Sequence, residues 1–465
     1  MSRTVLFFMH TGSTHGGVET WLDRSCQYLA GRGWRPIVAL VRGAANNDPN
    51  RYRSHHPNLA TVEVDGRGMD REGRVRAIVR CVRRVNPAIA IPMGVLDANE
   101  GIARYKAKNQ NVRLVGHAQG NLPPMLADLA GLRDVVDAVV CPGNLTRRFL
   151  VGPAGFDPTR VRHIPNGADG PTVPRVTGPP GGPLRLVYVG RMSEGDKRVS
   201  DLPRLCRTLG DRGIDYRLTV VGDGPARDAV AAGMAPFAER AEMLGALPVR
   251  KVYEEIYPRA DVLLLFSASE AFGIVLAEAM RNGVVPVTSR YVGFQSEGLV
   301  VEGTHGLSFP VGDTAAAADR VAALAADRAL LARLSAAGTR HADEHYSWER
   351  CLSAWEQALG TLAEAPSRAV SAETLRRTFA DRPALSGRLD RLGVPRAVTD
   401  IIRRARRTTL RAAVPPGGEE WPLFRGGPAD RRAWVQQELE RLESGAAAAG
   451  VARRPNGAPL KSKLI

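Results

Sequence analysis

Short apolar segments of strand length alternate with helical patterns along most of the 465-residue chain, which restricts its fold more than any other feature. The predicted strands of the first part are 4–9, 37–41, 60–64, 88–91, 113–117, 138–141 and 161–164. Those of the second part are 184–191, 216–221, 241–244, 261–266, 284–288 and 306–309. The longest helical pattern, at 313–340, is predicted as a single helix. Strands that alternate with helices form parallel sheets covered on both faces, so the sequence predicts an α/β protein.

A stretch rich in Gly and Pro at 170–183 divides this alternation into two parts. Because such a composition cannot hold a helix or a sheet, we interpret it as a linker between domains. We expect Rossmann-like, doubly wound domains over 1–169 and 184–345, which suits the length of the chain and its 44% hydrophobic content. A closing helix at 346–364 is expected to pack back toward the first domain. The remainder, 365–465, is expected to be a basic tail, helical or partly disordered.

The segment 269–280 follows the predicted strand at 261–266 and is expected to open a helix with Phe272 on its apolar face. Ligands of parallel α/β sheets bind at the carboxyl ends of strands, and the N–H groups of a helix start favour phosphate. The backbone of Phe272-Gly273-Ile274 is therefore a candidate anion site. Glu270 and Glu278 lie eight residues apart and could both face one ligand. The alternatives are that Glu270 only caps the helix and that Glu278 is a solvated helix residue.

Further candidates lie at other strand ends. Gly16 and Gly17 follow the first strand and precede a helix, although such a pair can also be no more than a tight turn. His117 ends the strand at 113–117, which could equally be its whole role. Arg191 and Lys197 follow the first strand of the second part. Arg can bind a diphosphate as a fork, and Lys can bind it as a point charge.

Two domains joined by a linker form a cleft between the carboxyl edges of their sheets. Cations for a diphosphate, together with carboxylates that accept hydrogen bonds from hydroxyls, indicate a nucleotide-diphosphate sugar. No GxGxxG follows the first strand and no GxxxxGK[ST] occurs, which argues against dehydrogenases and P-loop enzymes. No cluster of His, Cys and Asp has metal-ligand spacing, so neither a metal nor a cofactor is expected. The two cations would neutralise the departing diphosphate instead.

The five cysteines are far apart and form no CxxC pair, which indicates neither a disulfide framework nor a zinc site. No apolar run reaches about 18 residues, so no membrane span is expected. The apolar run at 4–9 is too short for the core of a signal peptide and is interpreted as a strand. These features predict a cytoplasmic protein. Peripheral association with the inner face of the membrane is a second, compatible prediction.

The last hundred residues, 366–465, carry 20 Lys and Arg against 10 Asp and Glu, and so supply most of the net charge of +16. An amphipathic pattern at 397–414 predicts a basic helix that could lie on an anionic membrane surface. The alternatives are a helix docked on the enzyme body, or an Arg-rich composition without a binding role; nucleic acid is a less favoured partner. A short helix at 430–443 and a disordered end at 445–465 are also predicted.

Five stretches of the sequence resemble, in their order and spacing, the retaining glycosyltransferases of the GT-B fold, specifically glycosyltransferase family 4. They are 16–19, 164–169, 189–198, 221–225 and 269–280. The resemblance spans roughly 4–362 and leaves out the last hundred residues. It implies two Rossmann-like domains facing a cleft, followed here by a C-terminal helical extension.

The resemblance also implies roles for the candidate residues. Glu270, the first acid of an E-x7-E pattern, would contact the hydroxyls of the donor sugar, and Glu278 would hold the ribose. Arg191 and Lys197 would bind the diphosphate, with help from the backbone at Gly17 and Phe272-Gly273-Ile274. His117 would lie beside the donor sugar. Ala271 stands where the family often has Pro, a difference that affects the stiffness of the turn more than its chemistry.

The predicted function is a retaining, metal-independent glycosyltransferase that uses a UDP- or GDP-sugar. The acceptor would be a polysaccharide, a glycolipid or a small metabolite, and the sequence does not identify it. The alternatives are a nucleotide-sugar epimerase of the same fold, or a membrane- or nucleic-acid-binding protein driven by its basic tail.

Overall fold

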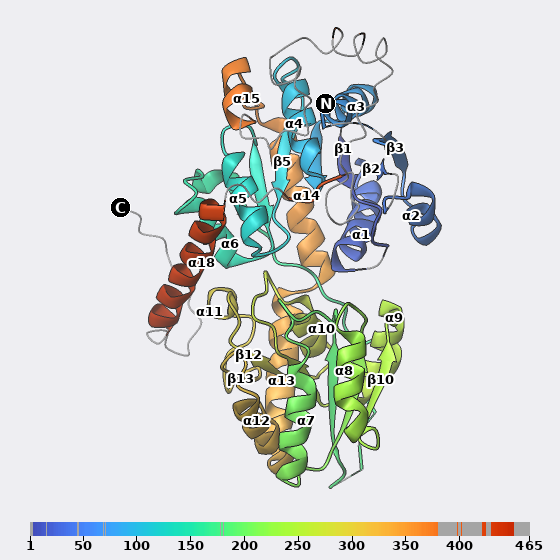
Figure 1. Cartoon of the computed structure of the whole chain (residues 1–465), viewed down its shortest axis with the longest axis vertical. Coiled ribbons are helices and arrows are strands. Elements are labelled where there is room, and N and C mark those ends of the chain that lie inside the picture. Colours follow the sequence, from blue (N-terminus) through green and yellow to red (C-terminus); the bar gives the residue numbers. More distant parts are fainter. Residues whose placement is uncertain are drawn as a thin grey trace.

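The computed structural model describes residues 3–379, apart from 15, 44–45, 68, 70, 177 and 180, and also 398, 401, 421–424 and 429–450. The chain forms two α/β halves that lie one above the other in Figure 1, each built around its own sheet. The prediction of an α/β protein with two doubly wound, Rossmann-like domains is confirmed.

The first half contains a seven-stranded sheet in the order β3-β2-β1-β4-β5-β6-β7, in which neighbouring strands pair in parallel. Its strands are β1 (Thr4–Met9), β2 (Arg35–Arg42), β3 (Thr61–Asp65), β4 (Ile89–Met93), β5 (Arg113–His117), β6 (Ala138–Cys141) and β7 (Val161–His163). Its helices are α1 (Gly17–Gly31), α2 (Pro49–His55), α3 (Arg71–Val85), α4 (Leu96–Lys106), α5 (Pro123–Gly131), α6 (Asn144–Val151) and the short η1 (Pro158–Arg160).

The second half contains a six-stranded sheet in the order β10-β9-β8-β11-β12-β13, also parallel. Its strands are β8 (Leu184–Val189), β9 (Tyr216–Val221), β10 (Ala241–Gly245), β11 (Val262–Leu265), β12 (Val285–Ser289) and β13 (Leu307–Phe309). Its helical elements are α7 (Asp201–Asp211), α8 (Arg227–Met234), η2 (Ala235–Phe237), α9 (Val249–Lys251), η3 (Val252–Ile256), η4 (Tyr257–Arg259), α10 (Ile274–Arg281), α11 (Phe294–Glu297), α12 (Thr314–Ala326) and α13 (Arg328–His345).

The prediction of one helix at 313–340 is wrong, because α12 and α13 are separate helices. Asp327 lies between them with an extended backbone, and its side chain accepts a hydrogen bond from the N–H of Leu330 at 2.8 Å. This N-cap ends one helix and starts the next. Because the sequence is rich in Ala on both sides of Asp327, its helical pattern continues across the break and does not reveal it.

Each sheet separates two apolar clusters, because its strands are buried on both faces. Along β1, Leu6 and Phe8 belong to one cluster, whereas Val5, Phe7 and Met9 belong to the other. All six residues of this strand are 5% exposed or less. Such continuous apolar runs are typical of a parallel sheet that helices cover on both sides.

The helix α14 (Trp348–Glu364) carries the chain from the second half back to the first. Ser347 is its N-cap and accepts a hydrogen bond from the N–H of Arg350 at 3.3 Å. Trp355 and Leu359 are buried in the cluster that also contains Trp21 of α1. The rings of Trp21 and Trp355 are 4.7 Å apart, so α14 is part of the core of the first half.

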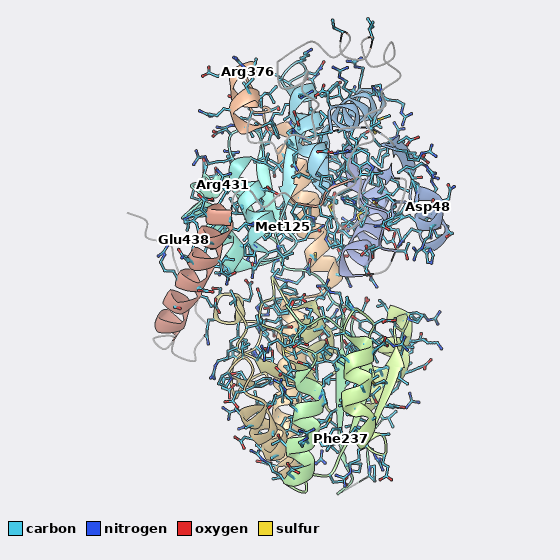
Figure 2. All side chains as sticks on the ribbon, in the orientation of Figure 1. Asp48, Met125, Phe237, Arg376, Arg431 and Glu438 are labelled. Atoms are coloured by element: carbon cyan, nitrogen blue, oxygen red, sulfur yellow. The ribbon has the colours of Figure 1, made fainter. Side chains whose placement is uncertain are left out.

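Three parts of the C-terminal extension pack on the first half and do not form an independent tail. They are α15 (Ala372–Thr378), the segment 421–424 and α18 (Ala429–Gly450). Figure 2 labels Arg376 on α15 and Arg431 on α18, both beside the first half. Trp421 is fully buried, and its indole N–H donates to the carbonyl of Arg42 at 2.9 Å.

One prediction for the extension needs correction, and two others concern residues that lie outside the described part of the chain. The predicted helix at 430–443 continues to Gly450, so the prediction of disorder is wrong for 445–450, where a run of alanines favours helix. The predicted basic helix at 397–414 falls outside the described residues except for 398 and 401, as does the predicted disorder at 451–465.

Candidate donor-binding site

Loops at the carboxyl ends of strands from both sheets meet directly at the boundary between the halves. Asn121 follows β5 and donates from its side-chain amide to the backbone carbonyl of Glu270, after β11, at 2.6 Å. Gly143 follows β6 and lies so close to Ala271 that a Cβ added to it would be 2.2 Å from the Ala271 carbonyl oxygen. The two carboxyl edges therefore face each other, as ligand binding at such edges requires.

Glu270 and Lys197 form an ion pair at this boundary, with 2.5 Å between Nζ and Oε1. The hydroxyl of Ser267, which is fully buried, donates to the same carboxylate oxygen at 2.5 Å. The side chains of Lys197 and Glu270 are only 19% and 12% exposed. Two predicted site residues, distant in sequence, are thus brought together in a partly buried position where electrostatic interactions are stronger than in water.

The helix α10 begins at Ile274, directly after Gly273, which has a φ of 79°. This left-handed conformation favours glycine, and no side chain caps the helix start. The first N–H groups of α10 remain available to an anion. The expectation that Phe272 lies on the helix is wrong: it precedes the helix and is buried, with its ring 5.3 Å from that of Tyr346. Only its backbone can belong to the site.

Glu278 lies on α10, where its carboxylate accepts a hydrogen bond from the hydroxyl of Tyr257 at 3.1 Å. Burial raises the pKa of Glu278 to about 7, and the hydroxyls of Tyr253 and Tyr257 partly oppose that rise. The side chain is therefore close to half-ionised at neutral pH. A carboxylate with this pKa can change its charge state when a hydroxyl of a ligand donates to it.

Arg191 lies in the loop after β8, and its side chain is 64% exposed. Its guanidinium pairs with Asp196, with 2.5 Å between Nη2 and Oδ2, and not with Glu270. The backbone of Asp196 accepts a hydrogen bond from the N–H of Ala268 at 2.8 Å. This contact joins the loop of Arg191 and Lys197 to the loop of Glu270, so the exposed side chain of Arg191 belongs to the same region as Glu270.

Gly16 and Gly17 form the start of α1. A Cβ added to Gly17 would have no atom within 4 Å, so the space in front of this backbone is open. A Cβ on Gly16 would be 2.7 Å from the carboxylate of Glu19, a buried acid of the first turn. The carboxylate of Glu19 thus lies at the positive end of α1, where negative charge is favoured.

His117 lies at the carboxyl end of β5, where its ring contacts those of Trp21 and Trp355 at centroid distances of 4.9 and 5.1 Å. Its Nδ1 is 3.1 Å from the sulfur of Met93. Burial lowers the pKa of His117 to about 3, so the ring is neutral at physiological pH and can only exchange hydrogen bonds. It also lines a cavity of about 50 Å³ that Leu423 of the extension helps to close.

Sequence reasoning missed several residues of this site. Asn121 lies in the loop that follows His117 and connects that strand end to Glu270. Arg24 on α1 pairs with Asp169 at 2.5 Å and so joins the first half to the start of the linker. Asp169 was visible only as the end of the 164–169 stretch. The partners of Asn121 and Arg24 are remote in sequence, so no local signal could have revealed these roles.

The close approach of α14 requires a glycine at position 167. A Cβ at Gly167 would be 2.6 Å from the Cα of Trp348, so α14 could not approach the chain here.

Within the described part of the chain, no three His, Cys, Asp or Glu side chains gather as metal ligands would, and no helix is long and apolar enough to cross a membrane. The five cysteines are buried and unpaired.

Two family models match the chain over adjacent ranges. Glycosyltransferase Family 4 matches residues 15–170, and Glycosyl transferases group 1 matches residues 171–341. The D-inositol 3-phosphate glycosyltransferase of Xylanimonas cellulosilytica is 28% identical over 260 residues, which are 51% of this chain and 60% of that protein. The phosphatidyl-myo-inositol mannosyltransferase of Mycobacterium leprae is 27% identical over 293 residues, which are 60% of this chain and 73% of that protein.

The chain thus spans less than two thirds of the first of these relatives. Among solved structures, Anabaena Alr3699/HepE in complex with UDP and glucose aligns with a TM-score of 0.61 at 16% identity. The alignment covers 77% of this chain and 99% of that one, which establishes a shared fold. Given the two facing sheets and the family matches, the chain belongs to the glycosyltransferases of the GT-B fold, of the family 4 type.

Proposed function

We propose that the chain is a retaining, metal-independent glycosyltransferase that transfers a sugar from a UDP- or GDP-sugar to a polysaccharide, glycolipid or metabolite. The observation that carries the proposal is the Lys197–Glu270 pair, next to the uncapped start of α10 at Gly273. A cation, a carboxylate and free N–H groups in one place match the diphosphate and hydroxyls of a nucleotide sugar. The solved structure with UDP and glucose supports this donor class.

The roles of the donor-binding residues follow from their environments. Lys197 has three N–H donors, so it can hold Glu270 and a phosphate oxygen at the same time. Arg191 can swing from Asp196 to the diphosphate because it is exposed. The amides that open α10, with the open backbone at Gly17, would complete the anion site. Glu270 would then accept hydrogen bonds from hydroxyls of the sugar.

The remaining two predicted residues would bind neutral parts of the donor. Glu278, with a pKa near 7, would accept a hydrogen bond from a ribose hydroxyl. His117 is neutral and lies on the opposite half, where its imidazole can hydrogen-bond to the donor sugar. Neither residue needs to carry charge for these contacts, which suits their buried positions.

The retaining step would use the leaving group as its base. The bond between the anomeric carbon and the diphosphate oxygen breaks, and the acceptor oxygen forms its bond on the same face of the sugar. The acceptor proton passes to the departing phosphate oxygen, whose negative charge Lys197 and Arg191 stabilise. Glu270 is held by Lys197 and Ser267, which fits a binding role better than that of a nucleophile.

The test is a thermal-shift panel of UDP-, GDP-, ADP- and TDP-sugars, because a bound donor stabilises the folded protein by mass action. One class of donor should raise the melting temperature of the wild type and of Glu239→Ala, an exposed control in the second half, and should raise that of Glu270→Ala by a smaller amount. Product NMR should show retained anomeric configuration, with turnover that survives EDTA. Absence of any donor shift would contradict the proposal, and an epimerised donor formed without acceptor would favour an epimerase.

A further inference from the structure

The helix α18 of the C-terminal extension contacts both halves of the molecule. On the first half, Val435 and Leu439 are buried among residues of the apolar cluster, and Trp434 lies 5.4 Å from the ring of Phe149 on α6. Figure 1 shows α18 running along α5 and α6 toward α11 of the second half. The extension is therefore placed to influence how the halves are held together.

Glu443 makes the contact between α18 and α11. Its carboxylate accepts hydrogen bonds from the backbone N–H groups of Gln295 and Ser296, at 2.6 and 3.2 Å, and from the Ser296 hydroxyl at 2.6 Å. The same hydroxyl accepts a hydrogen bond from Arg148 of α6 at 3.0 Å. A charged group that satisfies three donors in a partly buried position makes strong hydrogen bonds.

Glu297, at the end of α11, makes a reciprocal contact with the first half. Its carboxyl accepts hydrogen bonds from the N–H groups of Asn144 and Leu145, which open α6, at 2.7 and 3.0 Å. The side chain is only 2% exposed. Burial, together with the nearby charge of Glu443, raises the pKa of Glu297 to about 8. The ion-pair partner that the structure describes for Glu297 is His163, with 3.9 Å between Nε2 and Oε2, and burial lowers the pKa of this histidine. The N–H groups at the start of α6 are nearer and are the main partner of Glu297.

Both contacts lead to the backbone of Glu270. Val292, two residues before α11, accepts a hydrogen bond from the N–H of Glu270 at 3.3 Å. From α6, the Thr146 hydroxyl donates to the side chain of Asn121 at 2.5 Å, and Asn121 donates to the Glu270 carbonyl. Both backbone polar groups of Glu270 are thus fixed by elements that Glu443 and Glu297 hold in place.

We propose that Glu443 and Glu297 are positioning residues that lock α11 and α6 together and thereby hold Glu270 at the boundary between the halves. The C-terminal extension would then be a working part of the transferase. The kinetic consequence rests on the proposed function, whereas the structural consequence does not. Loss of the lock would displace Glu270, leaving Lys197, Glu278 and the nucleotide contacts in place, so turnover should fall more than donor affinity.

The experiment compares Glu443→Ala and Glu443→Gln with Glu440→Ala in the full-length protein. Glu440 is an exposed acid on the same helix, and the only described partner of its side chain is Gln436. Amide hydrogen exchange would be followed without ligand over 293–298 and 143–148. Glu443→Ala should exchange at least about tenfold faster than the control in both segments, since a charge-assisted contact is lost. Glu443→Gln should be intermediate because it keeps one acceptor oxygen.

The kinetic readout uses the donor sugar identified in the thermal-shift panel. Glu443→Ala should lower kcat about tenfold with little change in the donor KM, whereas Glu440→Ala should match the wild type. Unchanged exchange in 293–298 would overturn the inference. Faster exchange with an unaltered kcat would also overturn it, because α18 would then stabilise the contact between the halves without affecting turnover. If the wild type itself shows no turnover, the proposed function fails, and the exchange data still decide the structural part. Glu443→Gln serves in both assays if Glu443→Ala does not fold.

Discussion

Replacement of Glu278 by Gln should stabilise the protein while weakening its donor binding, and both effects should depend on pH. Burial raises the pKa of Glu278 to about 7, above the ordinary value of 4.5 for a glutamate side chain. Below pH 4.5 the carboxyl is protonated in both folded and unfolded states, so it has no pH-linked effect. As the pH rises from 4.5 to 7, the unfolded chain releases the proton and the folded protein keeps it, so folding stability falls.

The size of the effect follows from this difference in pKa. The interval between 4.5 and about 7 corresponds to about 3.4 kcal/mol, an upper bound because the side chain is partly exposed to water. A gain of about 1–3 kcal/mol above pH 7 would raise the melting temperature of a domain of this size by about 2–4 °C per kcal/mol. At pH 5 the gain should fall to about a quarter of its value above pH 7, because little of the pH interval in which the folded protein keeps the proton and the unfolded chain releases it has then been crossed.

The donor should respond in the opposite sense. A ribose hydroxyl donates more strongly to a carboxylate than to a neutral amide, so Glu278→Gln should bind UDP or GDP about tenfold more weakly at pH 8. At pH 6 the wild-type side chain is mostly protonated, and the difference should shrink. Calorimetric unfolding and titration at pH 5, 6 and 8, with Glu239→Gln as the exposed control, measure both effects. Equal stabilisation at pH 5 and 8 would refute the reasoning, as would destabilisation at pH 8.

Three further substitutions probe the boundary, the site and the extension. Gly143→Ala should separate the halves, because its Cβ would be 2.2 Å from the Ala271 carbonyl oxygen. X-ray scattering should then show a larger radius of gyration. The control Gly31→Ala, whose Cβ would have no atom within 4 Å, should leave the radius of gyration unchanged. Glu270→Ala should lower kcat/KM for the donor by about 10- to 100-fold, since it removes a charged hydrogen-bond acceptor, and an unchanged value would exclude the proposed role. Trp421→Ala should cost about 3–5 kcal/mol of folding free energy, because a fully buried ring and its hydrogen bond are lost, so denaturation at the wild-type midpoint would contradict its place in the core.

Much of the fold could be predicted because the relevant signals are local. β5, β6 and β9 begin and end at the predicted residues, since a buried parallel strand is a short apolar run between turns. Helices were harder to delimit. The cap at Asp327 depends on one side chain in an Ala-rich sequence, and α10 starts only after Gly273 because the left-handed backbone there prevents an earlier start.

The candidate site was predictable in its residues but not in its pairings. The spacing of Glu270 and Glu278 and the cations Arg191 and Lys197 are visible in the sequence. Which cation meets Glu270 is decided by the path of two loops that Ala268 and Asp196 join through a backbone hydrogen bond. Lys197 reaches Glu270, whereas Arg191 pairs with Asp196. Such a choice requires the relative placement of segments about 70 residues apart in the chain.

By itself, the sequence determined that this chain forms two parallel α/β halves around a linker, with acids, cations and glycines at strand ends. Those features follow from burial periodicity and backbone preference, which act over a few residues. Only the tertiary structure decided where the C-terminal extension packs. Trp421 is buried beside Gly66, and Glu443 binds α11 almost 150 residues earlier in the chain. Contacts over such separations depend on how the completed surfaces fit together, and no local pattern encodes that fit.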